Sequence, residues 1–280
     1  MIREVAPAKV NLVLRVGDVR ADGLHEICSL FASLELADEL TIERRTGGAR
    51  EDRVVCAGVE GPNLATTALG ELRSRLHGDL PPLEVTIDKR IPVAAGMGGG
   101  SADAAAVLRA ANSIAGDPLD STALRAVGAR IGADVPSQIQ PRHALVTGAG
   151  EHVEPLALPP MALVLVPQEE GLSTPDVYRA ADALGSTRAR LDPAALRALA
   201  AVPLTDLAAA LENDLEPAAL HLRPDLADPL AALRRAGALA ARVTGSGPTT
   251  FGVFPDRASA EEAAASISSK AIVTVTRDLA

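Results

Sequence analysis

A dense run of glycine between a β-rich segment and an alanine-rich segment is the strongest chemical signal in the sequence. Four glycines fall within five positions from Gly96 to Gly100, and Ser101 follows them where a strong helix former begins. Without Cβ atoms the backbone can approach an oxyanion closely, and the free N–H groups at a helix start concentrate positive potential there. The pattern predicts a cradle for phosphate groups at residues 96–101.

This cradle matches neither of two common phosphate-binding motifs. A Walker loop ends in Gly-Lys-Ser/Thr, and here Ser101-Ala102 stands where the lysine is expected. A dinucleotide-binding fold needs an acidic residue about 20 positions further on, after a second strand, and this chain has more helix there. A tight strand-to-helix turn that needs glycine only for packing is the structural alternative. The density of glycine, with Ser101 as a candidate N-cap, disfavours it.

Lys9 and Asp134 are the candidates for acid–base chemistry. Lys9 and Asn11 lie two positions apart in a β-rich stretch, so on a strand their side chains share one face. Asp134 lies in Gly-Ala-Asp-Val-Pro, where Pro136 prevents a helix from continuing. Taken singly, each is also typical of a surface lysine or a turn aspartate. Together with a phosphate cradle and Mg²⁺ they would suffice for phosphoryl transfer from ATP to an alcohol, which depends mainly on alignment and charge neutralisation.

A second glycine turn, at residues 243–249, separates two β-rich runs and contains Gly245 and Ser246. Alone it is a weak signal, because a hairpin without function explains it equally well. Paired with the first loop, it would close the phosphate site from the other half of the chain.

Composition excludes several classes of function. A formal net charge of −9 and the absence of a dense basic patch make nucleic acid an unlikely partner. Cys28 and Cys56 lie in unrelated apolar contexts, which argues against a disulfide framework or a zinc site. No apolar run approaches the roughly 18 residues of a membrane span, and the first residues do not resemble a signal peptide. We therefore expect a cytoplasmic protein without membrane contact.

The order of elements predicts an α+β protein with two lobes, because strands and helices alternate without the regular βαβ period. A soft boundary at the Pro-rich loop 158–160 divides the chain into residues 1–157 and 158–280. Predicted strands are Val10–Val16, Leu34–Glu43, Arg53–Ala57, Leu83–Ile87, Ala144–Thr147, Met161–Val166, Leu239–Thr244, Thr249–Phe254 and Ile272–Thr276. Predicted helices are Asn63–Leu76, Ser101–Ala115, Ser121–Ile131, Pro193–Ala201, Leu204–Leu215, Pro229–Ala241 and Ala258–Ser269.

These motifs together resemble the GHMP kinase superfamily, named for galactokinase, homoserine kinase, mevalonate kinase and phosphomevalonate kinase. Within it the chain resembles the 4-diphosphocytidyl-2-C-methyl-D-erythritol kinases of the non-mevalonate isoprenoid pathway, with the motifs in order along nearly the whole sequence. The segments that carry the resemblance are Pro7–Leu12, Arg20–His25, Asp88–Pro92, the glycine loop, Gly132–Pro136, Ser173–Tyr178 and Thr244–Gly247. The resemblance implies a two-lobed GHMP kinase fold with the active site in the cleft between lobes.

The resemblance also implies roles for individual residues. Asp134 would take the proton from the substrate hydroxyl, with Lys9 orienting it and offsetting developing charge. His25 would hydrogen-bond the cytosine edge, Tyr178 would stack on the base, and Asn11 would hold the methylerythritol portion. The residues implied in ATP binding are Asn63, Lys89, Pro92, Gly96, Gly98, Gly99, Gly100 and Ser101, with Ser101 also a candidate Mg²⁺ ligand. Those implied in substrate binding are Asn11, His25, Thr174, Tyr178, Gly245 and Ser246.

One position departs from the family pattern. Leu24 stands where the family usually has the tyrosine that completes an aromatic sandwich around the base, and losing one stacking face would cost about 1–3 kcal/mol. A kinase for homoserine, mevalonate or another small alcohol is therefore the second hypothesis. A homologue that binds nucleotide without turnover is the third, disfavoured because Lys9 and Asp134 are both present. A monomer and a homodimer are both compatible with the sequence.

Overall fold

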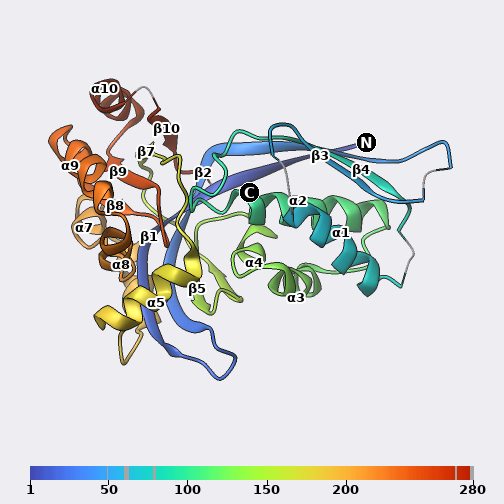
Figure 1. Cartoon of the computed structure of the whole chain (residues 1–280), viewed down its shortest axis with the longest axis horizontal. Coiled ribbons are helices and arrows are strands. Elements are labelled where there is room, and N and C mark those ends of the chain that lie inside the picture. Colours follow the sequence, from blue (N-terminus) through green and yellow to red (C-terminus); the bar gives the residue numbers. More distant parts are fainter. Residues whose placement is uncertain (49, 60–62, 78–79, 269, 278–280) are drawn as a thin grey trace.

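The strands form two separate sheets, one from each half of the chain (Figure 1). The structure is a computed structural model, and it describes residues 1–48, 50–59, 63–77, 80–268 and 270–277. Helices pack beside both sheets, which confirms the predicted α+β class with two lobes.

The first sheet is built around two long antiparallel strands. Its strands are β1 (Ile2–Val19), β2 (His25–Arg44), β3 (Arg53–Cys56), β4 (Leu83–Asp88), β5 (Ala144–Gly148) and β6 (His152–Pro155). β1 pairs with β2 from Ile2 opposite Ile42 to Val19 opposite His25, with register shifts along the way. β4 and β5 pair with opposite ends of β2, and β3 runs parallel to β4. The β1–β2 ribbon is therefore much longer than the strands predicted at Val10–Val16 and Leu34–Glu43.

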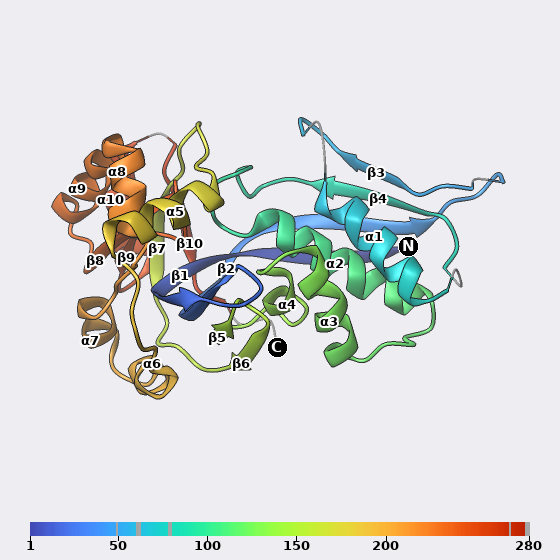
Figure 2. The same ribbon diagram turned by 60° about the horizontal axis from the view of Figure 1, so that its bottom comes forward.

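Four helices gather on one face of the first sheet (Figure 2). They are α1 (Leu64–Arg75), α2 (Gly99–Ile114), α3 (Ser121–Ile131) and α4 (Val135–Gln138). α2 is the most buried of them, because alanines such as Ala104, Ala105 and Ala106 let it lie close against its neighbours. Alanine thus fills the part of the core that aromatic side chains occupy in many proteins, as the low aromatic content requires.

The second half combines a four-stranded sheet with most of the remaining helices. The sheet has the order β10 (Ile272–Val275), β7 (Ala162–Val166), β9 (Thr250–Phe254) and β8 (Ala240–Val243). The helices are α5 (Thr174–Leu184), α6 (Pro193–Ala200), α7 (Leu204–Ala209), α8 (Glu216–Leu222), α9 (Ala227–Arg235) and α10 (Arg257–Ile267), with a 3-10 turn at Pro224–Leu226. No helix among the described residues is long and apolar enough to cross a membrane.

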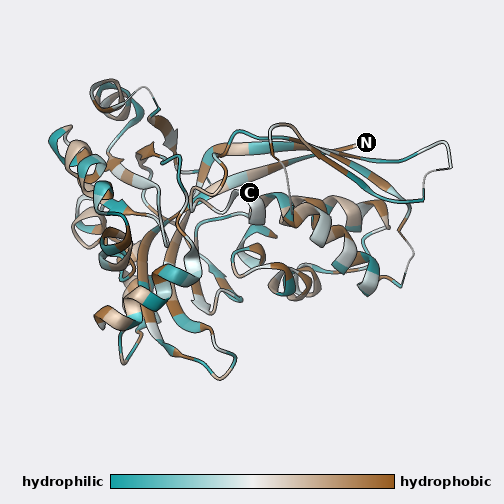
Figure 3. Ribbon diagram, viewed as in Figure 1, coloured by the Kyte–Doolittle hydropathy of each residue, from teal (hydrophilic) through white to brown (hydrophobic). Residues whose placement is uncertain are grey.

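The β1–β2 ribbon belongs to the core of both halves, and Figure 3 shows hydrophobic residues along both of its strands. Val10, Leu12 and Leu30 of the ribbon share one buried cluster with Leu163 and Phe251 of the second sheet. The chain passes from the first sheet to the second between β6 and β7. The division into residues 1–157 and 158–280 stays a prediction, because this shared core crosses it; residues 278–280 lie outside the described part.

Two predicted helices were wrong at their C-terminal ends. The helix predicted at Leu204–Leu215 ends at Ala209, because the following segment leaves the helix to pair Asn213 with Leu14 of β1. The helix predicted at Pro229–Ala241 ends at Arg235, because Gly237 takes a left-handed conformation with φ +89° and β8 follows. For the last helix, the predicted end at Ser269 lies outside the described residues.

Candidate active site

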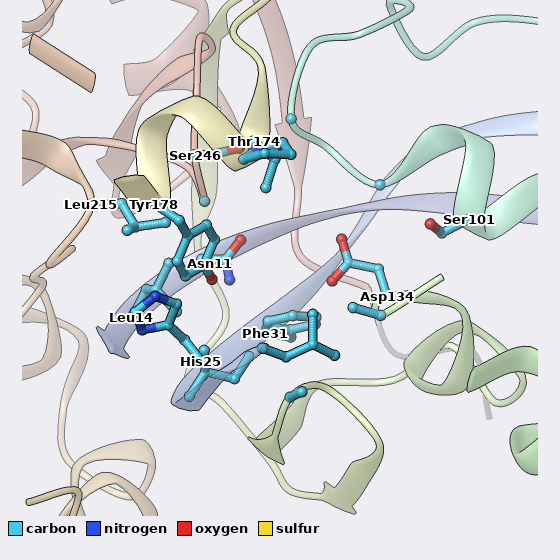
Figure 4. Close-up of a pocket in the computed structure, with 18 of the residues that line it drawn as sticks. Asn11, Leu14, His25, Phe31, Ser101, Asp134, Thr174, Tyr178, Leu215 and Ser246 are labelled. Atoms are coloured by element: carbon cyan, nitrogen blue, oxygen red, sulfur yellow. Dashed lines mark hydrogen bonds between the residues drawn. The ribbon is translucent and has the colours of Figure 1, made fainter. Parts of the chain in front are cut away.

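A cavity of about 710 Å³ lies along the β1–β2 ribbon where the two halves meet (Figure 4). Its walls come from the ribbon, the glycine loop before α2, the turn before α4, helix α5 and the turn between β8 and β9. The predicted site residues that line it are Lys9, Asn11, His25, Gly96, Gly98, Ser101, Asp134, Thr174, Tyr178, Gly245 and Ser246. The structure thus brings together residues from both halves of the chain.

The glycine loop forms one wall, and its backbone conformation favours glycine at two positions. Gly96 and Gly98 have φ +73° and +71°, in the left-handed region that favours glycine. A Cβ on Gly96 would lie 2.4 Å from the carbonyl oxygen of Gly247, so the two glycine turns are in backbone contact. α2 then starts at Gly99 with no acidic residue in its first turn, so its first N–H groups present positive potential to an anion.

Lys9 is buried, and three neighbours surround its ammonium group. Nζ lies 3.1 Å from Asp134 Oδ2, donates a hydrogen bond to Asn11 Oδ1 at 2.8 Å, and sits 4.4 Å from the centroid of the Phe31 ring. The backbone N–H of Lys9 donates to the carbonyl of Met97 at 3.0 Å, which ties β1 to the glycine loop. The two predicted catalytic residues are therefore in contact beside the predicted phosphate cradle.

Asp134 projects from the short turn between α3 and α4. Val135 N–H donates to the Gly132 carbonyl at 3.1 Å, and Ser137 Oγ donates to the Asp134 carbonyl at 2.7 Å. Behind this turn, Gly150 approaches so closely that a Cβ on it would lie 2.4 Å from the Ala133 carbonyl oxygen. The turn is thereby held from both sides, while the Asp134 side chain keeps 33% exposure toward the cavity, where it can receive a proton.

The polar atoms of the Asn11 side chain are hydrogen-bonded mainly to other protein groups. Its Nδ2 donates to Ser29 Oγ at 3.0 Å, and Ser29 Oγ donates in turn to the Val13 carbonyl at 2.6 Å. Because Oδ1 accepts from Lys9, these bonds fix the position of the lysine ammonium group. The predicted contact between Asn11 and the methylerythritol portion of a substrate stays a prediction.

His25 and Tyr178 meet at the other end of the cavity. Their ring centroids are 5.0 Å apart at an interplanar angle of 31°. His25 Nδ1 donates to the Gly17 carbonyl at 2.9 Å, while Nε2 lies 3.3 Å from Asp182 Oδ2. Burial, and secondarily the charge of Asp134, raises the pKa of Tyr178, so its hydroxyl stays protonated. Leu24 is 53% exposed and lines the cavity beside them.

The second glycine turn brings two hydroxyl groups to the cavity wall. Thr174 Oγ1 and Ser246 Oγ are 2.9 Å apart, one on α5 and the other on the turn between β8 and β9. Asn213 holds this turn by donating from Nδ2 to the carbonyls of Val243 and Gly245, each at 2.8 Å. Since Asn213 also pairs with β1, it fixes the second glycine turn relative to Lys9.

Five residues predicted to contact ATP do not line the cavity, and two of them, Gly99 and Gly100, begin α2. Asn63 caps α1 by accepting a hydrogen bond from Ala65 N–H at 2.9 Å, and Pro92 is half-buried. Lys89 lies beneath the start of α2, where its Nζ donates to Asp38 at 2.5 Å and Asp103 at 2.7 Å. ATP contacts from these five residues stay predictions.

Lys89, Asp38 and Asp103 form a buried charge cluster. Burial alone would lower the pKa of Lys89, but the two carboxylates outweigh it and raise that pKa. Burial raises the pKa of Asp103 to about 6 despite Lys89, because one ammonium group is shared between two acids. Asp103 Oδ1 is buried without a hydrogen-bond partner among the described residues. The cluster joins β2, the residue after β4 and α2 below the phosphate cradle.

Sequence reasoning missed several residues of the cavity. The sequence around Phe31, which lies under Lys9, does not indicate a functional role, because its pattern is that of an ordinary strand. Helix α5 was also missed, although Ser173 and Pro175 form a recognisable helix start. Recognising α5 would have placed Asp182 on the same face as Tyr178, four residues apart.

A fold of this shape, with a glycine loop beside a lysine–aspartate contact, defines a class of small-molecule kinases. Two family models match the chain: the GHMP kinase N-terminal domain over residues 63–140 and the GHMP kinase C-terminal domain over residues 195–273. The chain belongs to the GHMP kinase family.

Within that family, the chain is similar along nearly its whole length to 4-diphosphocytidyl-2-C-methyl-D-erythritol kinases. The kinase of that name from Streptomyces coelicolor is 42% identical over 270 residues, which cover 92% of this chain and 89% of the relative. A crystal structure of a 4-(cytidine 5'-diphospho)-2C-methyl-D-erythritol kinase matches with a TM-score of 0.81 at 33% identity, over 99% of this chain and 100% of the other. A homoserine kinase from Cytophaga hutchinsonii reaches 0.73 at 19% identity, over 99% and 94%, which shows the shared fold alone. The resemblance expected from the motifs is confirmed.

Proposed function

We propose that this protein transfers the γ-phosphoryl group of ATP to the C2 hydroxyl of 4-diphosphocytidyl-2-C-methyl-D-erythritol. The observation that carries the proposal is the 3.1 Å contact between Lys9 and Asp134 beside the glycine loop, in the same cavity as His25 and Tyr178. The relatives named for this reaction support the same substrate. A cytoplasmic location, where ATP is available, is part of the proposal.

The geometry assigns a role to each charged group. Asp134 accepts the proton of the C2 hydroxyl as the hydroxyl oxygen bonds to the γ-phosphorus, and the bond to the bridging oxygen breaks to release ADP. Lys9, held by Asn11 and Phe31, contacts Asp134 and offsets charge on the transferring group. The N–H groups at the start of α2 receive the ATP phosphates.

Mg²⁺ is the metal this chemistry implies, and the residues present fit it. No group of three His, Cys, Asp or Glu in the described part of the chain could hold a metal ion. Mg²⁺ bound to a nucleotide, however, keeps several waters and needs only one or two protein oxygens besides the phosphates. Ser101, at the start of α2 on this cavity, offers a side-chain oxygen for that role. The ion would neutralise phosphate charge.

The test is an ADP-release assay over a panel of alcohols. We expect turnover with 4-diphosphocytidyl-2-C-methyl-D-erythritol and at least about 100-fold lower kcat/KM with homoserine, mevalonate or methylerythritol phosphate, which lack the cytidine handle. That difference corresponds to about 2.7 kcal/mol, a normal value for losing a stacked and hydrogen-bonded base. Comparable rates with homoserine or mevalonate would instead establish the second kinase hypothesis. ATP binding without ADP formation for any alcohol would establish the third.

A substitution at Leu24 tests whether the base binds at the end of the cavity formed by His25 and Tyr178. A tyrosine at this position would add an aromatic face opposite Tyr178, because Leu24 is exposed and lines the cavity. We expect Leu24→Tyr to lower the KM for the cytidine substrate about tenfold with little change in kcat, on the scale of base–aromatic stacking. Leu239→Tyr, at another exposed leucine that does not line the cavity, is the matched control. An unchanged or higher KM in Leu24→Tyr would place the base elsewhere.

A further inference from the structure

We propose that Arg109 is a positioning residue that sets the distance between Lys9 and Asp134 by bridging the two segments that carry them. The inference rests on the proposed function, because it concerns the lysine–aspartate pair of that reaction. Arg109 lies on α2, which packs against both β1 and α4 (Figure 2). Its side chain does not line the cavity, so it acts on the reaction only through the groups that it holds.

The guanidinium group of Arg109 donates to a main-chain carbonyl on each side. Nη1 donates to the Gln138 carbonyl at 2.6 Å, and Nη2 donates to the Val5 carbonyl at 3.1 Å. Val5 lies on β1, four residues before Lys9. Gln138 is the last residue of α4, four residues after Asp134. One planar group therefore joins the strand that carries the lysine to the turn that carries the aspartate.

Glu4 fixes the orientation of this guanidinium group. Its Oε2 accepts from Arg109 Nε at 2.9 Å and from Nη2 at 2.6 Å. The side chains of Arg109 and Glu4 are only 21% and 20% exposed, so solvent and salt screen the pair weakly. Hydrogen bonds between ionised groups are shorter and stronger than neutral ones, and the guanidinium fork is rigid. The bridge from β1 to α4 is therefore strongly directional.

α4 needs a directional bond because it is only four residues long. A helix of this length does not persist by itself, and its last carbonyl groups have no partner within the helix. Arg109 supplies the partner for one of them. Val135 packs in the apolar core, but apolar contacts are non-directional and fix the orientation of the turn less narrowly. Without Arg109 the turn would stay in the core but lose its fixed orientation toward β1.

A simpler interpretation is that Arg109 only anchors α2 to β1. The two interpretations predict different kinetic changes. If Arg109 only anchors α2, its removal displaces the glycine loop at the start of that helix, and the KM for ATP rises. If Arg109 positions the lysine–aspartate pair, the phosphoryl-transfer step slows, and the KM values for ATP and the diphosphocytidyl substrate change little.

The experiment measures the single-turnover rate of Arg109→Met with saturating ATP and 4-diphosphocytidyl-2-C-methyl-D-erythritol. We expect the rate to fall about tenfold with both KM values within about twofold of wild type, because a misplacement of about 1 Å can cost about 10²-fold. Arg109→Lys should recover part of the rate, since an ammonium group can still donate to Glu4 and to one carbonyl. Glu4→Gln combined with Arg109→Met removes the bridge without leaving a carboxylate unpaired, so it should show the same loss even where Arg109→Met alone folds poorly.

A further double variant separates positioning from a general loss of structure. In the Asp134→Asn background no carboxylate remains to be positioned. Adding Arg109→Met to Asp134→Asn should therefore slow the reaction by less than about twofold, as for residues that act as one unit. A general loss of structure would instead multiply the two effects.

Arg73→Met is the matched control. Arg73, on α1, makes the same pattern of bonds, because it donates from Nε and Nη2 to Asp52 and also to the carbonyls of Leu80 and Pro81. It does not line the cavity and does not contact the segments of Lys9 or Asp134. Arg73→Met should lower the unfolding temperature as Arg109→Met does, but it should keep the wild-type single-turnover rate.

The outcomes distinguish the inference from the proposed function. A wild-type rate in folded Arg109→Met, a loss that appears only in the KM for ATP, or a loss that persists in full in the Asp134→Asn background would overturn the inference and leave the proposed function intact. A wild-type rate in Asp134→Asn itself would overturn the inference together with the role of Asp134 in the proposed function.

Discussion

Asp134→Asn is expected to reduce kcat with 4-diphosphocytidyl-2-C-methyl-D-erythritol by about 10²–10⁴-fold, the usual contribution of a positioned general base. The substitution preserves the size and shape of the side chain but removes the site that accepts the hydroxyl proton. The buried Lys9 ammonium group loses its carboxylate but keeps Asn11 Oδ1 and the Phe31 ring, and the asparagine carbonyl can still accept from it, so the protein should stay folded. Single-turnover rates with saturating ATP, together with thermal unfolding, separate a lost chemical step from a lost fold.

Lys9→Met should cause a loss of similar size, because Asp134 and the transferring phosphoryl group both depend on the Lys9 ammonium group. Two residues that act as one unit are not additive, so the double variant should be little worse than either single variant. Asp176→Asn is the control, since it lies on α5 outside the cavity and should keep wild-type kcat. A loss below about threefold in both single variants, with the fold intact, would remove this pair from the mechanism.

Local sequence signals predicted the parts of the site that depend on local structure. The glycine loop could be predicted because the backbone conformation at Gly96 and Gly98 disfavours residues with side chains. The helix that follows could be predicted from its alanine content. Lys9 and Asp134 were paired by the resemblance to a family, and the structure places them in contact. Nothing in the residues alone fixes that distance, because six of the described elements, from β2 to α3, separate the two residues along the chain.

The predictions failed where contacts between distant segments override local preference. The stretch around Asn213 has the composition of a helix, yet it leaves the helix to bond β1 and the second glycine turn. The ammonium group of Lys89 is held by Asp38 and Asp103, residues 51 and 14 positions away, which its motif did not indicate; its contact with ATP stays a prediction. Phe31 beneath Lys9 is likewise visible only once β1 and β2 are paired.

The buried cluster leads to the largest expected effect on stability. Lys89→Met should lower the free energy of unfolding by about 3–5 kcal/mol, because it leaves two buried carboxylates without their cation. Lys270→Met is the matched control. Lys270 makes the same kind of ion pair with Glu169, but both side chains are exposed, so the loss should stay below about 1 kcal/mol. Denaturant unfolding monitored by circular dichroism gives both values.

The pH dependence of the stability lost in Lys89→Met identifies the cause of that loss. Burial already raises the pKa of Asp103 to about 6, and removing Lys89 raises the folded-state pKa of Asp103 further. The folded variant then binds more protons than the folded wild type, so lowering the pH favours the folded variant and the difference in stability narrows from pH 8 to pH 5. Adding Asp103→Asn to Lys89→Met should recover part of the loss at pH 8. A deficit that is the same at both pH values would show that lost packing, rather than the unpaired carboxylates, destabilises the variant.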